Sequence, residues 1–123
     1  MNLLDFAENE YINLITYRKD NTPVTTPVWL SSVEDYLVIT TNVNAGKVKR
    51  IRANGKATIY TTDQRGSKKL SDEIDVKASI IQDENEKQLG VKSIKKKYFP
   101  ISKMFIRGSD EMRAIIKLEE KEE

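Results

Sequence analysis

A short segment of the chain combines hydroxyl, glycine and lysine residues in an order that can bind phosphate. Residues 36–52, YLVITTNVNAGKVKRIR, contain a β-type run ending at Thr40 and Thr41, then a turn, then Lys47 in the first turn of an expected helix. A helix N-terminus offers free N–H groups and the positive end of the helix dipole. The segment is not a Walker A loop, because no G-x-x-x-x-G-K-[ST] is present. It predicts a phosphate site, and the alternative is an ordinary capped helix whose lysines face solvent.

Residues 22–30, TPVTTPVWL, form a second segment that could contact a ligand. Pro27 has no N–H group, and prolines in sheets occupy edges, bulges or places where backbone meets ligand. Unpaired backbone groups there could hydrogen-bond a heterocycle, and Trp29 would add a flat apolar face. The alternative is that Trp29 is simply a large core residue. A third candidate is Arg65, in the sequence DQRG, which could bind a phosphate or carboxylate or merely lie in a surface turn.

Basic residues are concentrated in one part of an almost neutral chain. The net charge is +2, yet residues 44–69 contain eight basic side chains and one acidic side chain, a net of +7. A local basic block favours a compact anionic ligand over a long polyanion, and the alternative is a solvated basic face. A single-stranded nucleic acid would require aromatic residues among the basic ones, and residues 44–59 contain none. We therefore expect a small phosphorylated ligand and no nucleic-acid partner.

Composition excludes several kinds of chemistry. The 123 residues include no cysteine and no histidine, which excludes disulfides, thiolate nucleophiles, Ser-His and Cys-His catalysis and nearly every zinc site. No Asp-rich calcium loop is present, so we expect no metal. No apolar run approaches the roughly 20 residues that cross a bilayer, and the acidic N-terminus lacks the basic region of a signal peptide. These features predict a cytoplasmic protein with no membrane partner.

Apolar periodicity predicts a single domain over residues 1–123 built mainly from strands. The strands are expected at 11–18, 22–32, 36–41, 56–62, 74–81 and 111–118, with helices at 44–54 and 84–98. A short helical turn is expected within residues 2–10, with Leu4 and Phe6 buried, and a turn at 31–35. The charged tail, EEKEE, is expected to fray. Hairpin turns and alternation favour an antiparallel sheet whose six strands hide their edges by closing into a small barrel.

The two helices carry further expectations. The first should place Val48 and Ile51 on its buried face, take Asn42 or Asn44 as its N-cap, and end at Asn54-Gly55. The second should place one apolar stripe on the sheet. That stripe comprises Val91, Ile94 and Tyr98.

The order of these motifs resembles a known superfamily. YRKDNTPVTTPVWL, then YLVITT, then AGKVKRIRANGKATIY, then DQRG is similar to the flavin-binding split-barrel proteins of the pyridoxamine 5′-phosphate oxidase-like superfamily. Within it, the chain most resembles the branch of deazaflavin (coenzyme F420)-dependent oxidoreductases. The similarity is close over residues 10–66 and looser to residue 118, through a helix that contains Lys97-Tyr98.

The resemblance implies a mainly β fold, a six-stranded antiparallel split β-barrel with short helices. It implies a homodimer with two cofactors at the interface. The strand at 24–29 would lie along the cofactor ring, through Thr26, Pro27, Val28 and Trp29. Thr41 and Lys47 would lie at the phosphate, with Lys49, Arg50 or Arg52 nearby. Arg65 would reach the cofactor or the dimer interface.

The expected function is that of an oxidoreductase that transfers a hydride between coenzyme F420 or FMN and a small-molecule substrate. F420 carries a glutamate tail in addition to its phosphate, so it would use more of the basic block. No acidic residue obviously serves as a proton donor, so the catalytic residues stay unassigned. Two alternatives remain, a flavin-binding or carrier protein without turnover and a small-barrel nucleic-acid-binding protein.

Overall fold

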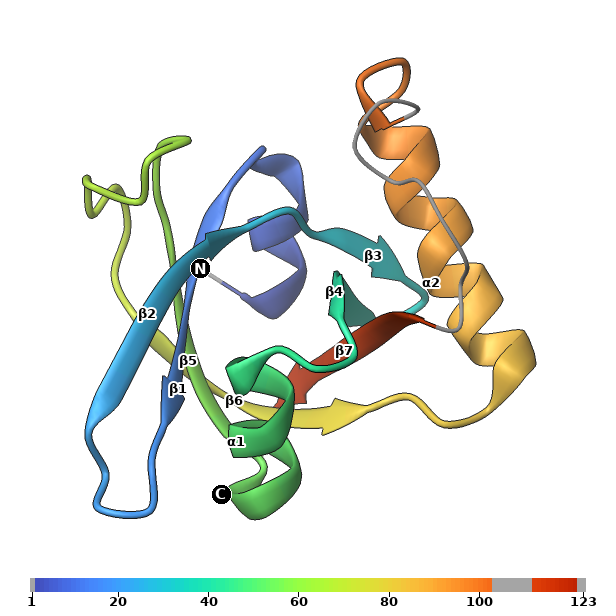
Figure 1. Ribbon diagram of the computed structural model, residues 1–123. Helices are drawn as coiled ribbons and strands as arrows, with labels where there is room; N and C mark the ends of the chain where they lie inside the picture. The colour runs from blue at the N-terminus through green and yellow to red at the C-terminus, as the bar shows by residue number, and fades with distance from the viewer. Residues whose placement is uncertain (1, 103–111, 122–123) are drawn as a thin grey trace.

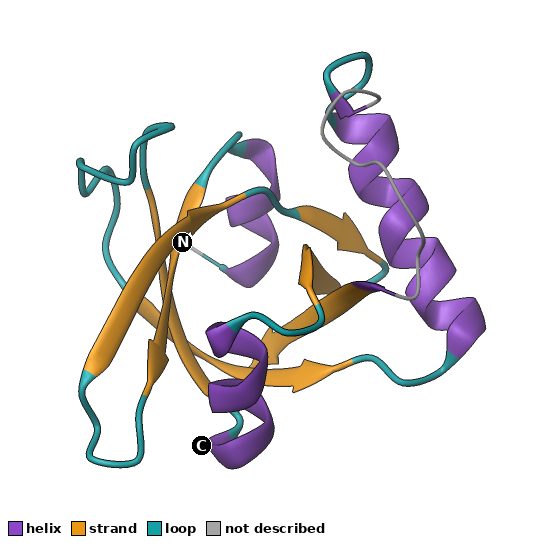
Figure 2. Ribbon diagram, viewed as in Figure 1, coloured by secondary structure: helices purple, strands orange, loops and turns teal. Residues whose placement is uncertain are grey.

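A strongly curled antiparallel sheet forms most of the protein in the computed structural model, which describes residues 2–102 and 112–121 (Figure 1). The strands follow the order β2-β1-β5-β6-β7-β4-β3 in one seven-stranded sheet. In chain order the elements are η1 (Leu3–Glu8), β1 (Ile12–Tyr17), β2 (Pro23–Val28), β3 (Ser31–Val33), β4 (Tyr36–Asn42), α1 (Gly46–Asn54), β5 (Lys56–Thr61), β6 (Ile74–Ile80), α2 (Glu84–Lys97) and β7 (Arg113–Glu120). The predicted mainly β antiparallel split barrel with short helices is confirmed (Figure 2).

The strand count differs from the prediction by one. Residues 31–35 were expected to form a turn, but Ser31–Val33 is the short strand β3, which pairs with the start of β4. Glu34, at φ 53°, lies in the tight turn between the two strands. The serines made this strand look like a loop, yet the Ser31 hydroxyl is buried and hydrogen-bonds the Ser93 hydroxyl on α2 at 2.5 Å.

The end of the chain is more ordered than expected. Glu119 and Glu120 were assigned to a fraying tail, but both belong to β7 and pair with Lys77 and Val76 of β6. Backbone pairing therefore outweighs the charged composition of these two positions. Residues 122 and 123 lie outside the described residues. Across 2–102 and 112–121, no helix is both long and apolar enough to span a membrane.

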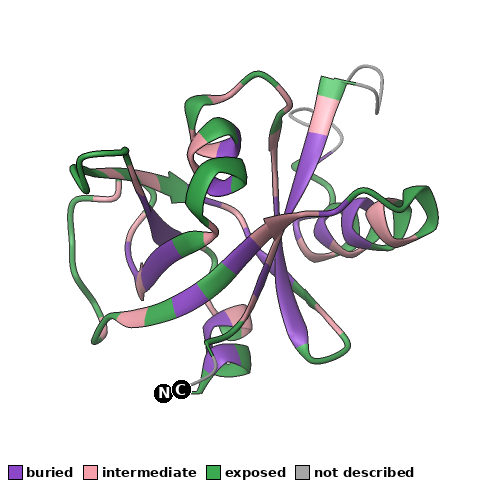
Figure 3. Cartoon of the chain, turned by 90° about the horizontal axis from the view of Figure 1, so that it is seen from below, coloured by how far each residue is buried: buried purple, intermediate pink, exposed green. Residues whose placement is uncertain are grey.

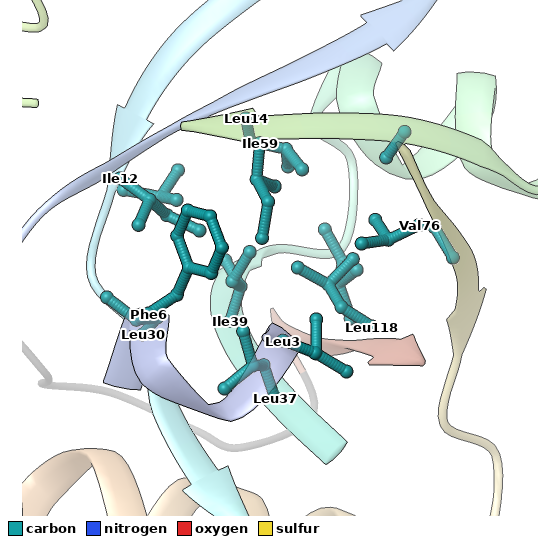
Figure 4. Close-up of a cluster of buried hydrophobic side chains, with 14 of the residues drawn as sticks. Leu3, Phe6, Ile12, Leu14, Leu30, Leu37, Ile39, Ile59, Val76 and Leu118 are labelled. Carbon is teal, nitrogen blue, oxygen red and sulfur yellow. The ribbon is translucent and has the colours of Figure 1, made fainter. Parts of the chain in front are cut away.

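The inner face of the curled sheet holds the main core (Figure 4). The helix η1 enters one end of it and buries Leu3 and Phe6, whereas Leu4 is 42% exposed. The expectation that Leu4 is buried was wrong, because a 3₁₀ helix has three residues per turn and aligns residues i and i+3. The side chains that pack against Leu3 and Phe6 in this core come from β1, β4, β5, β6 and β7, and they include Leu14, Leu37, Ile59, Val76 and Leu118.

The helix α2 covers part of the outer face and forms a second core. Its predicted stripe is confirmed, since Val91, Ile94 and Tyr98 are buried against residues such as Val38 and Ile115. Gly90 permits this close approach, because a Cβ there would lie 3.1 Å from Ile115 Cγ2. Buried and exposed positions alternate along β2 and in the middle of β6, whereas most of β1 and the first half of β4 are buried on both faces (Figure 3).

The last turn of α2 holds together the two ends of the sheet. Lys97 Nζ donates to the carbonyl oxygens of Ala7, Asn9 and Leu30 at 2.8, 2.7 and 2.7 Å. Tyr98 Oη accepts from Leu30 N at 3.0 Å and donates to the Glu10 carbonyl at 2.7 Å. Burial lowers the pKa of Lys97 to about 8. Since Leu30 lies between β2 and β3, this contact fixes the corner at which the chain passes from one sheet edge to the other.

Replacing Lys97 with methionine should destabilise the protein. Lys97→Met keeps most of the aliphatic stem but removes three charge-assisted hydrogen bonds, which predicts a loss of about 2–4 kcal/mol in the free energy of unfolding. Urea denaturation of this variant and of Lys96→Met measures the effect. Lys96 is exposed on the same turn, so its variant should stay within about 0.5 kcal/mol of the wild type. Equal stability of the two variants would contradict this role for Lys97.

Candidate functional site

Two hydroxyls and two cations converge where α1 packs across the open end of the barrel. Arg50 Nε donates to Thr16 Oγ1 on β1 at 2.7 Å, and Lys47 Nζ lies 3.5 Å from Thr41 Oγ1 at the end of β4. Lys47 and Arg50 are three residues apart, so they share one flank of the helix. We call Thr16, Thr41, Lys47 and Arg50 the phosphate cluster.

The positive charge of the phosphate cluster is not neutralised. Both cations are half-buried, and no carboxylate in the part of the chain that the structure describes forms a salt bridge with either. Burial, followed by the charge of Arg50, lowers the pKa of Lys47. Gly46 contributes by its lack of a side chain, since a Cβ there would lie 2.7 Å from Arg50 Nη1. Two like charges held together in this way favour binding of an anion.

The N-terminus of α1 lies at this cluster without a side-chain cap. The expected N-cap, Asn42 or Asn44, was wrong, because Ala45 occupies that position. Asn42 Oδ1 instead accepts from Asn44 N at 2.8 Å in the turn before the helix. The first-turn N–H groups therefore keep the positive character that favours phosphate. The predicted end of the helix is confirmed, with Gly55 at φ 68°.

The strand β2 is an edge strand, which agrees with its two prolines. Thr26 and Val28 face the interior, opposite Leu14 and Ile12 of β1. Val28 is buried in the core, whereas Thr26 is half-buried nearer the open end. Pro27 points to the outer face and is exposed. The four ring-contact candidates at 26–29 therefore divide between the two faces of the strand.

Trp29 lies outside the phosphate cluster. Its ring stacks on Tyr98 with centroids 4.2 Å apart and planes 4° from parallel, and it packs against the second core. One face of Trp29 is therefore occupied by Tyr98. The stacking on Tyr98 favours the alternative that Trp29 is a core residue.

Arg65 belongs to a turn that is tightly held against the outer face. Asp63 accepts hydrogen bonds from Ser67 N and Ser67 Oγ, both at 2.9 Å. Asn13, which is fully buried, donates to the Gly66 carbonyl and to Tyr60 Oη, also at 2.9 Å. These contacts place the turn beside Pro27, and Arg65 itself is exposed.

The remaining basic candidates do not join the phosphate cluster. Lys49 and Arg52 are exposed on the opposite flank of α1. Thr16 is the residue that sequence reasoning missed. Its signal was a hydroxyl at the inward-facing end of the alternation Ile12, Leu14, Thr16, and it is 1% exposed.

Alanine at Gly66 should be far more costly than alanine at Gly55. Both glycines have positive φ, 72° and 68°, so each substitution incurs the strain of about 1–2 kcal/mol that left-handed backbone imposes. A Cβ at Gly66 would also lie 2.7 Å from Oδ1 of the immobilised Asn13, whereas the nearest atom to one at Gly55 is 3.5 Å away. Urea denaturation of Gly66→Ala and Gly55→Ala should give a difference of at least about 1 kcal/mol. Equal losses would mean that the turn can move freely.

Comparison with protein families gives one match that spans the chain. The family model for pyridoxamine 5′-phosphate oxidase matches residues 3–122. No curated protein sequence matches the chain.

Several solved structures share the fold at low sequence identity. An F420 reductase is 17% identical with a TM-score of 0.66, and the match covers 99% of this chain and 95% of that one. A FAD-binding protein from Mesorhizobium loti is 11% identical with a TM-score of 0.67, over 95% and 83% of the two chains. HutZ, the heme storage protein from Vibrio cholerae, is 11% identical with a TM-score of 0.72, over 100% and 93%. At such identities these likenesses establish the fold alone.

Proposed function

Because the chain belongs to the pyridoxamine 5′-phosphate oxidase family, as its sequence motifs indicated, we propose that it binds a phosphorylated flavin-type cofactor, FMN or coenzyme F420. The observation that carries this proposal is the phosphate cluster, in which Lys47 and Arg50 are held together beside two hydroxyls with no carboxylate salt bridge among the described residues. A phosphate would supply the missing negative charge. The residues present therefore fit the phosphate that both cofactors carry.

We assign each group of the site a role in binding. Lys47 and Arg50 would hold the phosphate, Thr41 would add a hydrogen bond, and Thr16 would orient the Arg50 guanidinium through its 2.7 Å contact. Val24 and Thr26 of β2 are half-buried and lie on the same face of the sheet as Thr16, so they are the part of β2 available to a ring system. The bound ring supplies two-electron hydride transfer, and the protein supplies binding, orientation and electrostatics.

We further propose that the protein is an oxidoreductase acting on a small-molecule substrate. The F420 reductase with the same fold supports this reading, whereas HutZ is an example in which the fold serves heme storage. A binding or carrier protein is therefore the second candidate. Turnover of a chemical hydride acceptor by the cofactor-loaded protein would distinguish the two.

The arrangement of charges bears on the choice of cofactor. Of the eight basic residues in 44–69, Lys47 and Arg50 face the cluster, while the other six are exposed. Two cations suit the single phosphate that FMN and F420 share, so the basic block as a whole is not an argument for F420. The absorbance spectrum of protein purified from a host that makes both cofactors would identify the one it binds.

Binding of FMN should depend on Lys47 and Arg50 and not on Arg52. Losing a charge-assisted bond to phosphate costs about 1.5–3 kcal/mol, which corresponds to a rise in Kd of roughly ten- to a hundredfold. We expect this rise in the Kd for FMN in fluorescence titrations of Lys47→Ala and Arg50→Ala. Arg52→Ala is the charge-matched control, and its Kd should stay that of the wild type. Lys47→Ala should not lower the stability of the cofactor-free protein, because burial and Arg50 already disfavour its ammonium form.

The same variants test the nucleic-acid alternative. If a nucleic-acid single strand bound along the basic block, Arg50→Ala and Arg52→Ala would weaken its binding to a similar extent. A plot of the logarithm of its binding constant against the logarithm of salt concentration would have a slope of about −0.7 per phosphate contacted. We expect no such binding. Equal effects of the two substitutions, together with oligonucleotide binding and unchanged FMN affinity in Lys47→Ala, would reject the proposed function.

We also propose that two copies associate with the cofactor at their interface. On the outer face, the turn with Arg65 lies beside the exposed Pro27, at the end of β1 and β5 that is far from Tyr17 and Lys56. A partner at that end could contribute its own turn to the site. Sedimentation of the FMN-loaded protein should therefore give a species of twice the chain mass of 14.1 kDa. A compact species of the chain mass would reject this arrangement.

A further inference from the structure

The outer face of the sheet contains a cavity that the proposed cofactor site does not use. Its volume is about 500 Å³, which lies within the range of small-molecule sites. Most of its lining residues come from the β1–β2 turn, the start of β5 and the first half of β6. Figure 1 shows how these elements are arranged. The chemistry of the cavity comes from six side chains, which we call the basic pocket: Tyr17, Lys56, Thr58, Asp75, Lys77 and Lys121.

Two lysines of the basic pocket face each other across paired strands. Lys56 of β5 and Lys77 of β6 are direct partners in the antiparallel register, so their side chains leave the same face of the sheet. Like charges in such a pair are destabilising. Glu119 lies opposite Lys77 on β7, yet no described carboxylate forms a salt bridge with Lys56, Lys77 or Lys121. The pair therefore lacks a protein counter-charge in direct contact.

The wall of the pocket has hydrogen-bonding groups with a defined polarity. Thr58 Oγ1 donates to Asp75 Oδ1 at 2.7 Å, so it must accept the proton of Tyr17 Oη, which is also 2.7 Å away. The second oxygen of Asp75 has no partner among the described residues. Tyr17 Oη likewise keeps acceptor capacity. The pocket thus offers ammonium donors around hydrogen-bond acceptors.

We propose that the basic pocket binds a small molecule that carries two or more acid groups together with a hydroxyl or amine donor. Its acid groups would bind Lys56, Lys77 and Lys121, and its donor would bind the free oxygen of Asp75 or the Tyr17 hydroxyl. The acid groups relieve the repulsion between Lys56 and Lys77, and the donor satisfies the acceptors that the chain of hydrogen bonds leaves open. This ligand class covers hydroxy-polycarboxylates and phosphorylated alcohols alike.

The basic pocket is separate from the phosphate cluster. Thr16 and Tyr17 are neighbours on β1, and successive strand residues point to opposite faces of a sheet. Thr16 contacts Arg50 on the inner side, while Tyr17 lines the pocket on the outer side. The two sites have no lining residue in common. The inference does not rest on the proposed function, because it would hold for a protein without a flavin.

Citrate and tricarballylate are the matched probes for this site. Both carry three carboxylates, and only citrate has a hydroxyl donor. Isothermal titration of the purified protein should show citrate binding about fivefold tighter, the value of one hydrogen bond near 1 kcal/mol. Lys56→Gln and Lys77→Gln should each lower the affinity for citrate at least about fivefold. Lys77→Arg should retain most of the affinity. The control Lys92→Gln, at an exposed position on α2, should leave the affinity unchanged.

Thermal unfolding gives an independent readout. Citrate should raise the Tm of the wild type and of Lys47→Ala alike, and should not raise that of the double variant Lys56→Gln/Lys77→Gln. Without citrate, the double variant should be at least as stable as the wild type, since a like-charge pair has been removed. The proposal is overturned if citrate does not bind, or if it binds the double variant and Lys92→Gln equally well. Loss of FMN binding in Lys47→Ala with citrate binding retained would separate the two sites.

Discussion

The corner at Leu30 is the constraint on which the rest of the structure depends. The two edge strands of the sheet, β2 and β3, are consecutive in the chain and are separated by Trp29 and Leu30. A sheet whose first and last strands are joined by so short a connection must curl. Lys97 and Tyr98 hold that corner through bonds to both backbone groups of Leu30 and to the chain just after η1. The same curl brings the end of β4 toward β1, where α1 closes the open end of the barrel.

This closure creates a cluster that is unfavourable in the free protein. Arg50 and Lys47 lie together on one flank of α1, and burial and mutual repulsion both lower the pKa of Lys47. Core packing does not require these cations, because Val48 and Ile51 are the residues that bury the helix. Like charges without counter-charges persist where a ligand supplies the opposite charge.

Sequence reasoning located the regular elements well, because periodicity is a local property. The alternation at Val76 and Ala78 and the stripe of α2 are visible without knowledge of the fold. The sequence-based predictions were wrong or incomplete where contacts between distant parts of the chain determine the local structure. Ser31 and Ser32 form the strand β3 because they pair with β4 and because Ser31 contacts Ser93 of α2. Thr16 belongs to the site because α1 packs on it and Arg50 donates to its hydroxyl. The role of Lys97 at the corner was not foreseen, because its three carbonyl partners are at least 67 residues away in the sequence.

The most direct test of the central claim compares two ligands that differ by one phosphate. FMN and riboflavin share the same ring and ribityl chain, so a difference in their affinity for the wild-type protein reports on the phosphate alone. The phosphate cluster predicts that riboflavin binds at least about tenfold more weakly than FMN, as expected for the loss of a charge-assisted hydrogen bond. The difference in affinity between FMN and riboflavin should decrease as the salt concentration rises, because the interaction is electrostatic. Equal affinities at low salt would contradict the assignment of Lys47 and Arg50 as the phosphate site.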